Sequence, residues 1–269
     1  MQQTLTPTQH VPAPRLAPSA APSADRFETR WATCLEEVRM AQRLRYRVFA
    51  QEMGVHLPAP RGTPQGHDVD RFDDFCEHVL VLAWQAEGAG PQVVGTYRVL
   101  TPEAAVRAGG CYSETEFDMG RLAPLRPRMV ELGRSCVDPQ WRSGGVILAL
   151  WSALGEFMLA RGLDIAFGCA SIDLKDGGHR AATIWQRLAA QHLAPDTMRT
   201  APLHPLPLDG LRKNEDAPMP PLIKGYLRCG AELLGPPAWD PQFNTADLPM
   251  LMELHSLPAR HRRRFAAGA

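Results

Sequence analysis

The sequence predicts a mixed α/β fold with a mostly antiparallel, twisted sheet flanked by helices. Two β-rich runs, "VLVLAW" and "VVGTYRVL", are separated by a Gly-containing turn, and strand-like and helical stretches alternate further along. Neighbouring β-rich runs indicate a hairpin, whereas strand, helix, strand order indicates a right-handed crossover with parallel pairing. With 269 residues, 45% of them hydrophobic, the chain can bury a substantial core.

The first half of the chain supplies a tail, a helix and the hairpin. Residues 1–27 are rich in Pro, Ala, Ser and Gln and offer little to bury, so we expect a disordered tail. We expect a single domain over residues 28–265. A helix is predicted over residues 34–53, where apolar side chains recur at three- and four-residue steps. A Pro/Gly loop and the acidic stretch "VDRFDDFCEH" then lead into the hairpin.

The second half supplies the parallel unit. "RMVELGRSCVD" predicts a strand, Gly145 to Arg161 a helix, "LDIAFGCAS" a strand and residues 180–192 a helix. Residues 195–219 are polar and Pro-rich and predict a long loop, a feature that usually carries function or mobility. Beyond it, "PPLIKGYLRCGAELL" predicts a short helix that starts at proline, and "DLPMLMEL" a closing strand.

Composition excludes several classes of function. Lys plus Arg and Asp plus Glu both number 29, so no global charge indicates a nucleic-acid partner. The six cysteines include no CxxC pair, which argues against disulfides and a zinc site. We predict no metal, because His67, His78 and His179 lack the spacing of metal ligands. Without a signal peptide or a membrane-length apolar run, we expect a cytoplasmic protein.

The turn at residues 142–147 follows a strand and opens a helix. Backbone N–H groups at Gly144, Gly145 and Val146, with the positive end of the helix dipole, favour a phosphate there. Arg142 can add a charge-assisted hydrogen bond. The alternative is that Gly144 and Gly145 only permit a tight turn.

The residues around this turn resemble the acyl-CoA motif of the GNAT acetyltransferase superfamily. Val137, Pro139, Arg142 and Gly145 match that motif, while Ile147 stands where the superfamily has its last small residue. A bulky Ile147 should crowd a pyrophosphate, whereas a phosphopantetheine arm carries a single phosphodiester. We therefore expect acyl carrier protein as the donor substrate, rather than coenzyme A, and no separate cofactor.

A second set of residues is similar to the acyl-homoserine lactone synthases. Arg45 with Phe49, Asp70 with Asp73, Arg98, and Glu131 with Arg134 recur in the order and local spacing of that family. Val55 falls where those synthases place a tryptophan, which argues against S-adenosylmethionine as a substrate.

A closer resemblance runs from about Leu44 to Phe265, through "LRYRVFAQEMG", "DVDRFDDFCEH", "YSETEFD", "ELGRSCVDPQWRSGGVI", "PPLIKGYLRCGA" and "FNTADLPMLM". These stretches resemble the L-ornithine Nα-acyltransferase family. The resemblance implies transfer of a 3-hydroxyacyl chain from acyl carrier protein to the α-amine of ornithine, which is the first step of ornithine lipid synthesis. Alternatives are a lactone synthase, an acyltransferase for another amino acid such as glycine, lysine or glutamine, and a silent carrier-binding module.

Aminolysis of a thioester needs a base, hydrogen-bond donors and a binding slot. Glu131 is our candidate for the base; the alternative is that it pairs with Arg134 or Arg98. The resemblance also implies that backbone N–H groups from Gly133 to Cys136 polarise the carbonyl. Tyr226 is our candidate to protonate the leaving thiolate, with simple packing as the alternative.

The remaining candidates concern the acceptor and the carrier. Asp70 and Asp73 should attract the cationic ornithine, and Arg45 or Arg98, with Arg134 nearby, should hold its carboxylate. The alternative is a network that orders the loop.

Basic side chains are candidates to meet an acidic carrier: Arg142, Arg126, Arg128 and the tail "ARHRRRF". Because the product is an amphiphile, transient contact of the 195–219 loop with the inner membrane face is a further expectation.

Overall fold

The computed structural model describes residues 27–56, 58–84, 90–211 and 217–257. Nearly all of the predicted tail, and the basic run "ARHRRRF", lie outside these residues. The helices are α1 (Leu35–Tyr46), α2 (Pro102–Ala108), α3 (Gly145–Ala160), α4 (His179–His192) and α5 (Pro221–Arg228). The strands are β1 (Phe27–Trp31), β2 (Glu77–Ala83), β3 (Gln92–Leu100), β4 (Phe117–Asp118), β5 (Met129–Val137), β6 (Ile165–Asp173), β7 (Ala201–Pro202), β8 (Glu232–Leu233), β9 (Ala238–Asp240) and β10 (Thr245–Glu253).

One large sheet organises the described chain. Its strand order is β1-β2-β3-β5-β6-β10-β8, with β9 pairing to the end of β10, while β4 and β7 form a separate pair. Strands β2 and β3 form the expected antiparallel hairpin, and α3 connects β5 to a parallel β6. The other pairs of the large sheet are antiparallel, which confirms the predicted fold class.

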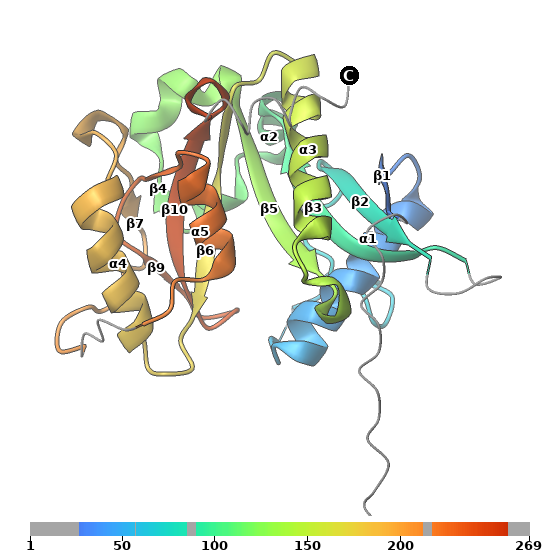
Figure 1. Ribbon diagram of the computed structural model, residues 1–269, viewed down its shortest axis with the longest axis horizontal. Helices are drawn as coiled ribbons and strands as arrows, with labels where there is room; N and C mark the ends of the chain where they lie inside the picture. Colours follow the sequence, from blue (N-terminus) through green and yellow to red (C-terminus); the bar gives the residue numbers. More distant parts are fainter. Residues whose placement is uncertain (1–26, 57, 85–89, 212–216, 258–269) are drawn as a thin grey trace, which may run out of the picture.

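Helices cover both faces of the sheet (Figure 1). On one face, α3 buries Val146 and Leu150 against Val81 and Tyr97, and α4 and α5 cover β6 and β10. On the opposite face, α1 packs against β2 and β3. This double coverage explains why β2 reads as an uninterrupted apolar run rather than an alternating one.

The middle of the sheet opens where β5 and β6 separate. The two strands pair over only three positions, from Met129 with Ile165 to Glu131 with Phe167. Just beyond, the register between β3 and β5 slips by one residue, so that Arg134 and Ser135 both lie opposite Tyr97. Arg134 has a left-handed backbone conformation (φ 49°). Such a bulge bends a strand and leaves backbone groups without a partner in the ladder.

Several elements were not predicted. Strand β1 has a half-exposed pattern without clear alternation. Helix α2 does carry a signal, because Thr101 caps its start, proline follows at the first position and Gly109 ends it. The expected loop at 195–219 contains β7 and a short 3-10 turn within its described residues. None of the described helices is both long and apolar enough to cross a membrane.

Candidate active site

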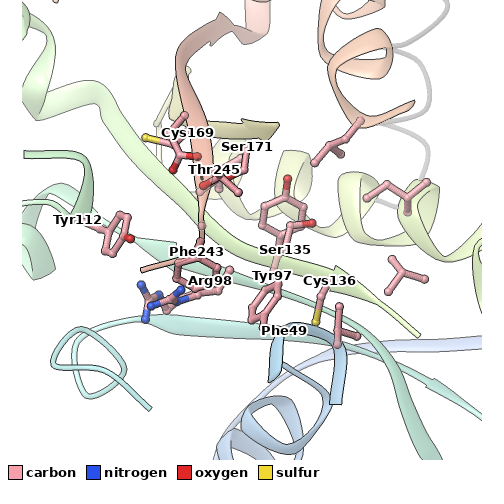
Figure 2. Close-up of a pocket in the computed structure, with 18 of the residues that line it drawn as sticks. Phe49, Tyr97, Arg98, Tyr112, Ser135, Cys136, Cys169, Ser171, Phe243 and Thr245 are labelled. Carbon is pink, nitrogen blue, oxygen red and sulfur yellow. Dashed lines mark hydrogen bonds between the residues drawn. The ribbon is translucent and has the colours of Figure 1, made fainter. Parts of the chain in front are cut away.

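A cavity of about 510 Å³ occupies the opening between β5 and β6. Its walls come from both faces of the sheet, so it connects the α3–α5 side with the opposite side. Figure 2 shows Cys169, Ser171 and Thr245 grouped at one end, Phe49 and Cys136 at another, and Tyr97 and Ser135 between them. Sequence-predicted residues in its walls are Arg98, Glu131, Arg134, Val137, Arg142, Gly144 and Tyr226.

The start of α3 forms one end of this cavity. Gly144 precedes the helix with a left-handed backbone (φ 103°), a conformation that side chains disfavour. The N–H groups of Gly145, Val146 and Ile147 belong to the first turn, which has no partners within the helix. The Val146 side chain is fully buried in the core, so only its backbone can meet a ligand. Ile147 lines the cavity.

Arg142 stands beside this turn but is already engaged. Its Nη1 and Nη2 donate to the two carboxylate oxygens of Glu52 at 2.6 and 2.7 Å, and its Nε donates to the carbonyl of Val137 at 3.0 Å. The side chain remains 46% exposed. A phosphate at the α3 turn would therefore compete with Glu52 for this guanidinium.

Glu131 lies in the cavity wall on β5 and is held by neutral donors. Its Oε1 accepts from the backbone and the hydroxyl of Ser113 at 2.7 and 2.6 Å, and its Oε2 accepts from the backbone of Tyr112 at 2.8 Å. The expected alternative, an ion pair with Arg134 or Arg98, is wrong, because these donors hold the carboxylate. Burial raises the pKa of Glu131, and the Ser113 and Tyr112 hydrogen bonds offset that rise only in part.

Tyr226 reaches the cavity from α5, where its hydroxyl is hydrogen bonded to that of Tyr97. Its ring also stacks on Trp151 of α3, with centroids 5.7 Å apart. The two helices approach so closely that a Cβ at Gly225 would lie 2.3 Å from the Trp151 ring. Burial and the neighbouring Tyr97 raise the pKa of Tyr226 well above its ordinary value, so the hydroxyl keeps its proton.

Behind the cavity, three arginines and three aspartates form a buried network. Arg45 contacts Asp68 at 2.8 Å and Asp73 at 2.7 Å. Arg98 contacts Asp70 at 2.6 Å and Asp73 at 3.2 Å. Arg134 contacts Asp70 at 2.9 Å and Asp68 at 3.8 Å.

The charges of this network neutralise one another. Although burial raises it, the ion pairs with Arg98 and Arg134 hold the pKa of Asp70 well below its ordinary value. Burial and the nearby Arg45 lower the pKa of His78 to about 4, so this histidine adds no charge.

This network corrects the sequence-based interpretation. Asp70, Asp73 and Arg45 do not line the cavity, and each is already paired with opposite charge. A cationic acceptor would have to displace an arginine, so the structure favours the alternative in which these residues order the loop. Arg98 and Arg134 differ, because both border the cavity. Both ion pairs of Arg98 run through Nη1, which leaves Nη2 for a ligand.

Sequence reasoning missed a second acidic group at the end of the cavity near β6 and β10. Asp240 and Asp247 line the wall, and single oxygens of Glu116 and Asp247 lie within 4.8 Å of each other and of Cys169 Sγ. All three carboxylates are more than nine-tenths buried. Sequence spacing does not reveal this group, because Glu116 lies more than 100 residues before Asp240 and Asp247, which come from the paired strands β9 and β10.

Comparison with known proteins identifies the chain's relatives. Residues 44–152 match the acetyltransferase (GNAT) domain family. An L-ornithine Nα-acyltransferase of Rhizobium meliloti is 35% identical over 272 residues, which cover 93% of this chain and 90% of that protein. One of Rhodobacter capsulatus is 37% identical over 256 residues, covering 91% and 95%. The chain belongs to the L-ornithine Nα-acyltransferase family.

A solved structure supports the fold of this acyltransferase. FeeM, an N-acyl amino acid synthase from uncultured soil microbes, superimposes with a TM-score of 0.53 over 88% of this chain and 97% of its own. At 12% identity, that likeness concerns the fold alone.

Proposed function

We propose that this chain transfers a 3-hydroxyacyl group from the phosphopantetheine arm of acyl carrier protein to the α-amine of L-ornithine. The product is an N-acyl amide, lyso-ornithine lipid. Membership of the family supports the acceptor. The single observation that carries the mechanism is one continuous cavity whose walls include both the α3 turn and Glu131, because a thioester arm needs such a channel to reach an amine.

The donor enters along α3. The first-turn N–H groups after Gly144 and the helix dipole bind the phosphodiester of the arm. Ile147 narrows the slot beside them, which favours one phosphate over a pyrophosphate. The arm belongs to the carrier, and aminolysis of its thioester requires no further cofactor.

Glu131 removes the proton from the attacking ammonium. Each carboxylate oxygen offers two lone-pair sites. Oε1 uses both on Ser113, whereas Oε2 accepts only one hydrogen bond from the described residues, that of Tyr112. Oε2 is therefore the atom that takes the proton, and the burial that raises its pKa makes it a stronger base.

The thioester carbonyl and the leaving thiolate use different groups. Backbone N–H groups of the bulge near Arg134 and Ser135 donate to the developing oxyanion. Tyr226 stays protonated until the thiolate leaves, passes its hydroxyl proton to the sulfur and recovers a proton from the amine nitrogen as the amide forms, while Tyr97 holds its hydroxyl in place. Nη2 of Arg98 binds the α-carboxylate of the acceptor.

Release of an amphiphile requires a route to lipid, and we assign it to transient contact with the inner membrane face. Leu203 and Trp239 are 51% and 45% exposed, and the Trp239 backbone bonds to His204, next to Leu203. This pair supports a contact through the loop expected at 195–219.

The test is a reconstituted reaction of the purified chain with 3-hydroxyacyl carrier protein and ornithine, with the product read by mass spectrometry. We expect N-acylornithine with the carrier donor and far less with the matching acyl-CoA. Equal use of both donors would contradict the donor assignment, and a glycine or lactone product the acceptor assignment.

A pair of variants tests the slot itself. Ile147→Ala should raise the use of acyl-CoA relative to the carrier donor, because it widens the phosphate slot. Leu148→Ala is the matched control, since Leu148 is 46% exposed and lies outside the cavity walls. An unchanged donor ratio in Ile147→Ala would remove this residue from donor selection.

A further inference from the structure

The carboxylates at the β6–β10 end of the cavity differ from Asp68, Asp70 and Asp73 in having no cationic partner. Within the described residues, no arginine, lysine or histidine lies within 4.0 Å of Glu116, Asp240 or Asp247. Asp240 accepts from the backbone of Gln242 and Phe243, and Asp247 accepts from the Thr245 hydroxyl. Burying acidic groups without a counter-charge is costly unless they keep a proton or a ligand supplies the positive charge.

Glu116 is the acid of this group with the fewest polar partners. Its side chain is 8% exposed, and neither carboxylate oxygen accepts a hydrogen bond of normal geometry from the described chain, although the Cys169 thiol and the Tyr112 hydroxyl lie near enough to interact with it. A buried acceptor without a donor costs free energy. One of its oxygens lies within 4.8 Å of Cys169 Sγ and of an Asp247 carboxylate oxygen, and both of those residues line the cavity, so Glu116 lies directly behind this wall.

Strand geometry explains why this end of the cavity is polar. Asp247 lies opposite Ser171 and Thr245 opposite Asp173 in the β6–β10 ladder. Because side chains alternate between faces, Cys169, Ser171, Thr245 and Asp247 share one face, and Figure 2 shows three of them together. The intervening residues face α4 and α5 in the apolar core.

We propose that Glu116, Asp240 and Asp247 form the pocket for the side-chain ammonium of the amino-acid acceptor, and so select a cationic acceptor over a neutral one. The inference rests on the proposed function, because it places the α-amine of the same acceptor at Glu131.

The spacing supports this placement. The Ser113 hydroxyl lies 2.6 Å from Glu131 Oε1 and 3.4 Å from Cys169 Sγ, and one carboxylate oxygen each of Glu116 and Asp247 lies within 4.8 Å of that sulfur. The two nitrogens of ornithine are five bonds apart and span about 6 Å when extended. One extended acceptor therefore reaches both Glu131 and the acidic pocket, whereas glycine has no side chain to do so.

The raised pKa values of the acids in this pocket are consistent with a cationic ligand. Burial and the neighbouring Asp247 and Asp240 raise the pKa of Glu116 to about 9, and burial raises that of Asp247 to about 6. An ammonium supplies the missing positive charge. A metal ion held by Glu116, Cys169 and Asp247 fits less well, because burial and Glu116 raise the pKa of the Cys169 thiol, which must lose its proton to bind metal.

The experiment compares ornithine with 2-aminopentanoic acid, which has the same carbon chain without the terminal amine. With saturating carrier donor, Glu116→Gln and Asp247→Asn should raise the KM for ornithine about 30-fold or more, the usual consequence of removing one partner of a buried charge pair. Transfer to 2-aminopentanoic acid should stay constant or rise. The control is Asp118→Asn, an exposed carboxylate two residues from Glu116, which should match the parent.

Binding measurements separate this inference from the proposed function. If the parent acylates ornithine and both variants keep its preference over 2-aminopentanoic acid, the acidic pocket is refuted and the function stands. If the parent transfers no acyl group, calorimetry that still finds tighter binding of ornithine, lost in the variants, supports the pocket and refutes the function. Loss of activity with EDTA and its return with Zn²⁺ would assign the pocket to a metal instead.

Discussion

Two groups of acidic side chains lie near this cavity, and their pKa values shift in opposite directions. Asp70 and Asp73 touch arginines at 2.6 to 3.2 Å, and the pKa of each is lowered despite burial. Glu116 and Asp247 are as deeply buried, and without a cation their pKa values rise. The first group, the saturated network, stabilises the fold because each of its acids already has a cationic partner. The second group lacks such partners, and it is the group that we propose binds a ligand. Glu131 lies between these limits, because backbone and hydroxyl donors, rather than a cation, satisfy it.

We expect the largest effect from substitution of Glu131, the proposed general base. Glu131→Gln should lower kcat for amide formation by about 10² to 10⁴, the usual contribution of a positioned general base. Gln retains the shape and one acceptor for Ser113 or Tyr112, so the fold should persist. Single-turnover rates would measure the loss, with circular dichroism as the control for folding. Unaltered amide synthesis would exclude Glu131 as the base.

The saturated network should be the more important of the two for stability. Arg45→Ala leaves Asp68 and Asp73 buried without their shared cation, and should cost about 3–5 kcal/mol of unfolding free energy. Urea denaturation measures it. Arg43→Ala on the same helix removes the largely exposed pair with Glu36 and a 3.5 Å contact with the His67 ring, and should change little. Equal effects of the two variants would show that the buried network does not stabilise the fold.

The two acidic groups should also give opposite dependence of stability on pH. The lowered pKa of Asp70 means that its contribution is present above about pH 4 and is lost in stronger acid. Glu116 has a raised pKa, so the folded state keeps a proton that the unfolded chain releases above its ordinary value of 4.5, and stability falls as pH rises toward about 9. The groups facing Glu116 are Asp247, Asp240, Cys169 and Tyr112.

Glu116→Gln isolates the alkaline part of that dependence. Relative to the parent, the variant should lose less stability between pH 5 and pH 9, by at least about 1.4 kcal/mol, the equivalent of one pKa unit. Saturating ornithine should flatten the parent curve in the same way. Parallel curves for parent and variant would contradict a raised pKa at Glu116.

The fold could be predicted from local patterns, and the site only in part. The apolar period of α1, the β2–β3 hairpin and the crossover through α3 all have short-range signals, and each is found in the structure. The turn at Gly144 could be predicted for the same reason, since the strand, the turn and the start of the helix are contiguous in the sequence. Strand β1 was missed because its burial depends on its partner β2 rather than on its own sequence.

The acceptor end depends on long-range topology. Glu116 follows a 3-10 turn, Asp240 ends β9 and Asp247 lies in β10. Pairing of β9 with β10 brings the two aspartates together, but Glu116 and Cys169 of β6 come from distant parts of the chain. From the sequence we predicted that Asp70 and Asp73 bind the cationic acceptor, because their three-residue spacing and the nearby arginines make a recognisable pattern. That pattern marks the pairs that already satisfy one another, and the unpaired acids have no local signature.

The most direct test of the account is the position of the new amide bond. In the reconstituted reaction, ornithine labelled with ¹⁵N at the α-amine should give a product whose tandem mass spectrum places the acyl group on the labelled nitrogen. That outcome requires the side-chain ammonium to be held away from the thioester while the α-amine reaches Glu131. Acylation of the unlabelled terminal nitrogen would mean that the acceptor binds in the reverse orientation, and would contradict both assignments.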